Sequence, residues 1–178
     1  TNMTGEFSRR SFLKYTALTA VAVAGSSLLT GCGSYSAMQY HVGTTNTVIK
    51  VAAKLEQVEY NAATTTTTFK LVVTNGPNTM MQLNALQVNA ENFAVTADGY
   101  LAAEGQNLYV TSPDAVNQQV KKGETRTFYV HAKGLNALEK DSVTFTFYPR
   151  PQKYGDFNAN WMLTKDVLEQ ELSTPSTT

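Results

Sequence analysis

The amino-acid sequence predicts an all-β protein, folded as a β-sandwich of about seven strands. Three observations lead to this prediction. Apolar and polar residues alternate with a period of two in several segments between residues 47 and 150. Turn-forming pairs such as Asp98-Gly99 and Lys122-Gly123 separate these segments. No stretch shows the strand–helix alternation that builds a parallel sheet, so a sandwich of short strands is favoured.

Two long strands come first. Residues 48–60 carry apolar side chains at 49, 51, 53 and 55 and then at 58 and 60. This change of phase near Glu56 predicts a bulge or a bend. Residues 64–75 are rich in β-branched side chains, and the sequence Asn-Gly-Pro-Asn at 75–78 predicts the turn that follows them.

Shorter strands are predicted at 80–88, 93–96, 100–101, 108–110, 125–132 and 143–148. The last of these alternates strictly, and Pro149 and Pro151 end it. Only residues 163–172 favour a helix, and a short one. The alternate positions of the two most regular strands are expected to face the core; they are Phe69, Leu71, Val73, Phe145 and Phe147.

The N-terminal region has the three parts of a secretory signal. Its cationic part is the run Ser-Arg-Arg-Ser-Phe-Leu-Lys at 8–14, and an uncharged, mildly hydrophobic segment follows at 15–29. Together they resemble a twin-arginine export signal. The resemblance implies export by the twin-arginine translocase, and the residues that carry it are Arg9, Arg10, Phe12, Leu13 and Lys14.

The uncharged segment ends in Leu29-Thr30-Gly31-Cys32, which resembles a bacterial lipobox. The resemblance implies that Cys32 is lipidated and becomes the new N-terminus. One alternative is an uncleaved transmembrane anchor, but about 15 residues are short for a spanning helix, which needs roughly 20. The other alternative is a free structural cysteine. Lipidation would place the protein on the outer face of the cytoplasmic membrane, in a bacterial cell envelope.

These features divide the chain into four parts. Residues 1–31 are a signal peptide with a helical apolar segment, and residues 32–46 are the lipidated cysteine and a flexible tether. Residues 47–172 form the sandwich domain, and residues 173–178 a disordered polar tail. Beyond residue 31 the chain has eleven Lys and Arg against thirteen Asp and Glu, without a basic patch, so nucleic acid is not an expected partner.

The strand map resembles a known family. The resemblance rests on four segments: Leu-Val-Val-Thr-Asn at 71–75, Asp-Gly-Tyr at 98–100, Val-Lys-Lys-Gly-Glu at 120–124 and Thr-Phe-Tyr-Val at 127–130. They resemble the telokin-like, immunoglobulin-type domain of unknown function that many bacterial lipoproteins carry. Lys122 stands where that family usually has proline. The resemblance covers about residues 47–150 and implies an immunoglobulin-like fold, but it implies no activity, because a fold does not define a function.

Catalytic chemistry has little support in the sequence. The two histidines, His41 in the tether and His131 at the end of an aromatic strand, have no ligand cluster around them that would suit zinc. His131 is interpreted as a polar residue at a strand edge. No nucleophile motif is present, and the nearest carboxylate pairs lie among turn residues. We therefore expect no enzymatic activity, no metal and no cofactor.

A loop after the last predicted strand carries the candidate contact residues. Residues 149–161 combine aromatic side chains with cations and two prolines, a combination that partner and carbohydrate surfaces use. The candidates are Arg150, Tyr154, Phe157 and Trp161. The alternative is that Phe157 and Trp161 fill one end of the core.

The first functional hypothesis is a lipid-anchored, non-enzymatic binding module with a protein or carbohydrate partner. The second is an accessory subunit of an enzyme complex that the twin-arginine route exports. The two hypotheses differ in whether the neighbouring gene encodes a twin-arginine exported enzyme.

Overall fold

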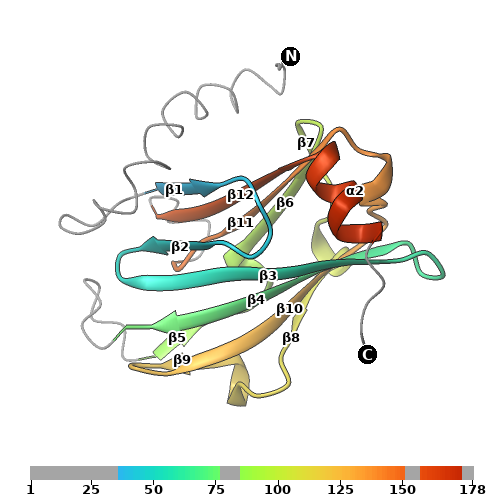
Figure 1. The fold of residues 1–178 in the computed structure, drawn as a ribbon. Coiled ribbons are helices and arrows are strands. Elements are labelled where there is room, and N and C mark those ends of the chain that lie inside the picture. Colours follow the sequence, from blue (N-terminus) through green and yellow to red (C-terminus); the bar gives the residue numbers. More distant parts are fainter. Residues whose placement is uncertain (1–35, 77–84, 151–156, 174–178) are drawn as a thin grey trace.

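A computed structural model of the chain describes residues 36–76, 85–150 and 157–173. Two five-stranded sheets pack face to face and enclose one hydrophobic core (Figure 1). The prediction of an all-β sandwich is confirmed. The described residues contain twelve strands rather than about seven, because short edge strands and an unforeseen strand at each end of the domain join the sheets.

The first sheet has the order β1-β12-β11-β6-β7. The pairs β12–β11, β11–β6 and β6–β7 are antiparallel, whereas β1 runs parallel to β12. The bounds are Ser36–Gln39 for β1, Asn158–Thr164 for β12, Ser142–Phe147 for β11, Phe93–Ala97 for β6 and Tyr100–Leu101 for β7.

The second sheet has the order β2-β3-β4-β10-β8 and is antiparallel throughout. Its bounds are Thr45–Val48 for β2, Val51–Asn61 for β3, Thr66–Asn75 for β4, Thr125–Lys133 for β10 and Leu108–Thr111 for β8. A separate pair is formed by β5 (Ala85–Gln87) and β9 (Gln119–Lys121). Within the described ranges, four short 3-10 helices connect strands: Ala90–Asn92, Gly105–Asn107, Val116–Gln118 and Ala137–Glu139.

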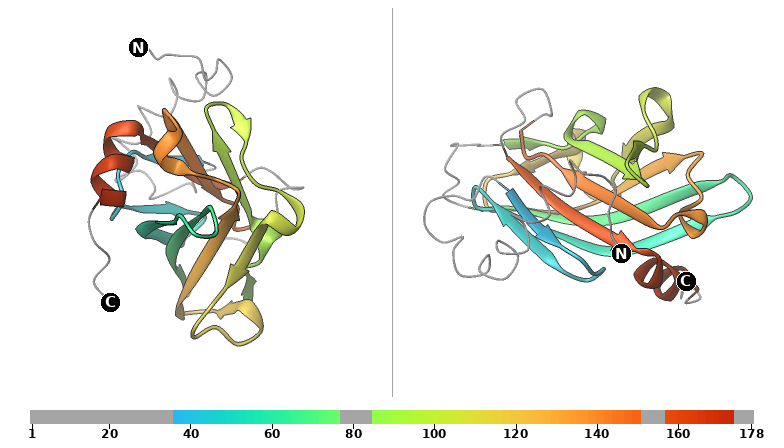
Figure 2. Two further views of the ribbon diagram at one scale, coloured as in Figure 1. Left: turned by 90° about the vertical axis from the view of Figure 1, so that its right-hand side faces the viewer. Right: turned by 90° about the horizontal axis from the view of Figure 1, so that it is seen from above.

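The helix α2 (Lys165–Ser173) confirms the short helix expected at 163–172. It packs against β3 at the end of the sandwich opposite the start of β1, as Figure 1 and Figure 2 show. Leu168 of the helix is buried in the core, and the Val58 amide donates to a carboxylate oxygen of Glu171 at 3.5 Å.

The strand predicted at 48–60 is interrupted at its start by a turn. Ile49 and Lys50 have φ values of 46° and 65°, so the chain reverses there and β2 and β3 form a hairpin. The predicted bulge is confirmed, because the β3–β4 register shifts between Leu55 and Gln57. The extra residue, Glu56, restores the inward direction for Val58 after Leu55.

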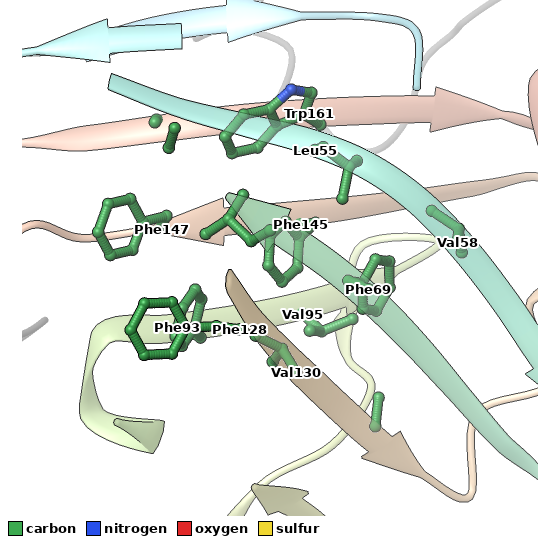
Figure 3. Packing of buried hydrophobic residues seen from close by; sticks show 14 of the residues in the cluster. Leu55, Val58, Phe69, Phe93, Val95, Phe128, Val130, Phe145, Phe147 and Trp161 are labelled. Atoms are coloured by element: carbon green, nitrogen blue, oxygen red, sulfur yellow. The ribbon is translucent and has the colours of Figure 1, made fainter. Parts of the chain in front are cut away.

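The core is aromatic at its centre, and Figure 3 shows its packing. The Phe69 ring of β4 stacks on the Phe145 ring of β11 across the two sheets, with 4.5 Å between centroids. Phe93 and Trp161 flank Phe145 at 5.5 Å and 5.8 Å. All five residues predicted to face inward are buried, which confirms the face assignment of both strands.

The flexible tether predicted at 32–46 is wrong for residues 36–46. Residues 36–39 form β1, and β2 begins at Thr45. Ala37 and Met38 are buried, and the buried Asn46 amide donates to the Asn160 carbonyl at 2.8 Å. The sandwich therefore includes residues 36–46, because these residues complete the edge of the first sheet and part of the second. Cys32 and the remainder of the tether lie outside the described residues.

Candidate functional site

The four predicted contact residues do not form one exposed group. Arg150 follows β11 and Phe157 precedes β12, and both are partly buried. Tyr154 lies outside the described residues. Residues 158–164, expected to be partly loop, form strand β12 in the first sheet.

Trp161 is a core residue, so its assignment as a contact residue is wrong. Its side chain is fully buried, and its indole N–H donates to the Thr44 carbonyl at 3.2 Å. The inward positions of β12 are Ala159, Trp161 and Leu163. For Trp161 the alternative interpretation, that the aromatic side chain fills the core, is therefore correct.

The outer face of the second sheet offers a better-defined group of side chains. Cross-strand pairing places Thr68, His131 and Tyr109 in one row and Lys70, Tyr129 and Thr111 in the next. Directly opposite side chains in a sheet lie close enough to interact. We call these six residues the outer patch.

His131 is the centre of the outer patch. Its Nδ1 lies 3.0 Å from the Thr68 hydroxyl and its Nε2 lies 2.9 Å from the Thr111 hydroxyl. Its ring stacks on Tyr109 with 4.6 Å between centroids and a 17° angle between the planes. Partial burial lowers the pKa of His131 below its ordinary value, because desolvation disfavours the charged ring. Tyr109 remains 42% exposed although His131 covers one face of its ring.

Lys70 of the outer patch forms a charged pair with Glu56 at the bulge of β3. The ammonium of Lys70 lies 2.9 Å from a carboxylate oxygen of Glu56, which the bulge turns towards solvent. The hydrogen bond to Glu56 raises the pKa of Lys70. A partly exposed pair of this kind adds little stability, but it places two opposite charges beside Tyr129.

The chemistry of the outer patch suits recognition. Both ring nitrogens of His131 already have hydroxyl partners, so an incoming molecule would meet the Tyr109 ring, hydroxyl groups and the Lys70–Glu56 charges. Within the described ranges, no group of three or more His, Cys, Asp or Glu side chains could hold a metal ion.

Sequence reasoning missed the outer patch because it considered His131 alone. The interpretation as a strand-edge residue is wrong, since β10 lies between β4 and β8 inside the sheet. Tyr129 and His131 stand two residues apart in β10, which places them on one face. That spacing was the available signal, but their neighbours come from strands about 20 and 60 residues away in sequence.

The export motif residues Arg9, Arg10, Phe12, Leu13 and Lys14 and the lipobox at 29–32 lie outside the described residues. Within the described part of the chain, no helix is long and apolar enough to cross a membrane. The described fold defines the class of the protein as an all-β sandwich. Neither the protein-family models nor the curated proteins contain a match to this sequence.

Proposed function

We propose that this protein is a lipid-anchored β-sandwich on the outer face of the cytoplasmic membrane, where it acts as a non-enzymatic binding module. The observation that carries the binding role is the outer patch, in which two threonine hydroxyls hold His131 and the His131 ring stacks on Tyr109. Aromatic rings positioned in this way need little ordering on binding, so they suit a protein or carbohydrate partner.

The anchor in this proposal is Cys32, the last residue of the lipobox and the single cysteine of the chain. Lipidation would attach two acyl chains to it. One chain binds a bilayer only marginally, whereas two anchor a protein stably, at about 0.8 kcal/mol for each buried methylene group.

We also propose that the sandwich is of the immunoglobulin type, as the telokin-like resemblance implies. The order of β3, β4, β10 and β8 supports it, because these strands correspond to A-B-E-D of that fold. In the other sheet, β12-β11-β6-β7 correspond to G-F-C-C′. The chain departs from the type in its tryptophan, which lies on the last strand rather than on C.

The anchor is tested by the substitution Cys32→Ala in the full chain. We expect the variant to leave the membrane fraction or to remain as unprocessed precursor, because the thiol that carries the lipid is gone. Fractionation of cells and incorporation of labelled fatty acid measure this. A Ser34→Ala variant, which leaves the lipobox intact, is the matched control. A Cys32→Ala protein that incorporates lipid as the original does would refute the proposal.

The binding role is tested by photo-crosslinking in intact cells. A photoreactive phenylalanine analogue at Tyr109 is expected to give discrete adducts with an envelope protein or glycan. The same analogue at Tyr100, which is 79% exposed on the other sheet, is the control for random encounters. Equal adducts from both positions, or none from position 109, would exclude the outer patch as a contact surface.

The alternative function is an accessory subunit of an exported enzyme complex. The observation that favours it is the twin-arginine motif, because that route exports folded proteins, many with cofactors. A neighbouring gene that encodes a twin-arginine exported enzyme would support it, and the adduct at Tyr109 would then contain that enzyme.

A further inference from the structure

Positively and negatively charged residues of the sandwich are concentrated at opposite ends. One end carries the start of β1, the start of β12 and the end of β4, at the left of Figure 1. We call it the β1 end. Its described loops and turns hold four cations and two carboxylates besides one ion pair: Lys50, Lys121, Lys122, Arg150, Glu91 and Asp114. That pair, Arg126 with Glu124 at 2.9 Å, cancels its own charge.

The opposite end carries α2, the β3–β4 hairpin and the turn between β6 and β7. We call it the α2 end. Three lysines lie there among seven carboxylates, so its charge is negative. The lysines are Lys133, Lys140 and Lys165, and the carboxylates are Asp98, Glu104, Glu139, Asp141, Asp166, Glu169 and Glu171. The nine residues of β10 run from one end toward the other, and at a strand rise of about 3.3 Å this strand is about 26 Å long.

The anchor enters the fold at the positive end. Only Gly33, Ser34 and Tyr35 separate Cys32 from Ser36, where β1 starts. Whatever conformation these residues take, four residue steps span at most about 14 Å. Ser36 is tied to β12, since its hydroxyl donates to the Asn158 side-chain oxygen at 2.9 Å. The predicted flexible tether of about 15 residues, which would let the domain turn freely, is therefore reduced to a very short connection.

From these observations we infer that the β1 end docks on the anionic lipid surface around the anchor, which leaves the α2 end pointing away from the membrane. The inference rests on the proposed lipid anchor. The short connection keeps the β1 end, which carries Lys50, Lys121 and Lys122, on the membrane side of the domain. Charges on that side act on lipid headgroups over a screening length of about 8–10 Å at physiological salt. Anionic lipids attract exposed basic residues at that range and repel carboxylates, so both ends favour the same orientation.

The orientation exposes the outer patch at the side of the sandwich. His131 and Tyr109 lie on strands β10 and β8, which run between the two ends. A partner would therefore approach parallel to the membrane, and it would itself be held near the membrane surface.

The experiment uses the full, lipid-modified chain in vesicles and one introduced thiol at a time. Because Cys32 is the only cysteine, lipidation leaves the introduced thiol as the single site for a fluorescent label. Ala85→Cys lies at the β1 end, paired with Lys121, and Ala63→Cys lies in the hairpin at the α2 end. Both positions are exposed, and neither substitution changes a charge. Spin-labelled lipid headgroups then quench whichever label is near the surface.

In vesicles of phosphatidylglycerol and phosphatidylcholine, we expect several-fold stronger quenching at position 85 than at position 63. Reversal of Lys50, Lys121 and Lys122 to Glu should reduce this difference, as should vesicles of phosphatidylcholine alone. Reversal of Lys133, Lys140 and Lys165 to Glu should not reduce it. Equal quenching at both positions would overturn the inference. So would a difference in quenching that charge reversal at the β1 end does not change.

A separate measurement distinguishes failure of the anchor from failure of the orientation. The unsubstituted protein is first treated with a thiol reagent in detergent. If the Cys32 thiol does not react and the labels at positions 85 and 63 are then quenched equally, the proposed orientation is overturned but the lipid anchor is not. A reactive Cys32 refutes the lipid anchor and overturns the orientation with it.

Discussion

The substitution Phe145→Ala is expected to lower the free energy of unfolding by about 3–5 kcal/mol, the usual cost of removing a buried phenylalanine. Phe145 is fully buried, and its ring contacts Phe69, Phe93 and Trp161. Because these partners come from both sheets, the substitution would leave a cavity at the sheet–sheet interface that no single side chain can fill. A loss of this size is a large part of the total stability of a typical domain, about 5–15 kcal/mol.

Urea unfolding followed by circular dichroism measures this loss. The fluorescence of Trp161, the single tryptophan, is a second probe because the ring moves from the core to water. Thr144→Ala is the matched control on the same strand, at an outward and only partly buried position, and should cost less than about 1 kcal/mol. A similarly small loss for Phe145→Ala would mean that the core does not depend on this aromatic stack.

The double substitution of Arg9 and Arg10 by lysine is expected to stop export almost completely. The change keeps both charges but removes the paired guanidinium groups, and lysine does not replace arginine where recognition uses the planar, forked donor group. Precursor should accumulate in the cytoplasm, and lipid-modified protein should disappear from the membrane fraction. Pulse-labelling with separation of precursor from mature protein measures both quantities.

The control for export is Lys14→Arg, which alters a neighbouring cation and leaves the arginine pair intact. This variant should be exported normally. If the double lysine variant is exported as efficiently as the control, the signal does not depend on the twin-arginine translocase, and the general secretory route would replace it in the proposal.

The sequence was sufficient for features that depend on neighbouring residues. Alternation identified the inward faces of β4 and β11, because side chains of a strand point to opposite faces in turn. The break in alternation at Glu56 located the bulge, and the pairs Asp98-Gly99 and Lys122-Gly123 located two turns, where both glycines have positive φ. Each of these signals lies within a few residues, so no knowledge of distant partners was needed.

Features that depend on distant partners were decided only by the tertiary structure. Strand β1 has no regular alternation of its own and forms because it pairs in parallel with β12, as the hydrogen bond from Ser36 to Asn158, 122 residues apart, illustrates. The polar residues Asn46 and Asn160 read as loop residues, yet both are buried. A buried amide is stable only when it is hydrogen-bonded, and their partners lie on other strands.

The candidate site shows the same division. The chemical types in the outer patch were visible in the sequence, but their grouping was not, because His131 meets Thr68 and Thr111 only through the pairing of β10 with β4 and β8. Likewise, the aromatic character of Trp161 was evident, while its burial followed from the position of β12 between β1 and β11. Local sequence thus determined which residues could form strands and turns. The tertiary structure determined which side chains meet, because those contacts join strands that are far apart in the chain and depend on how the two sheets pack.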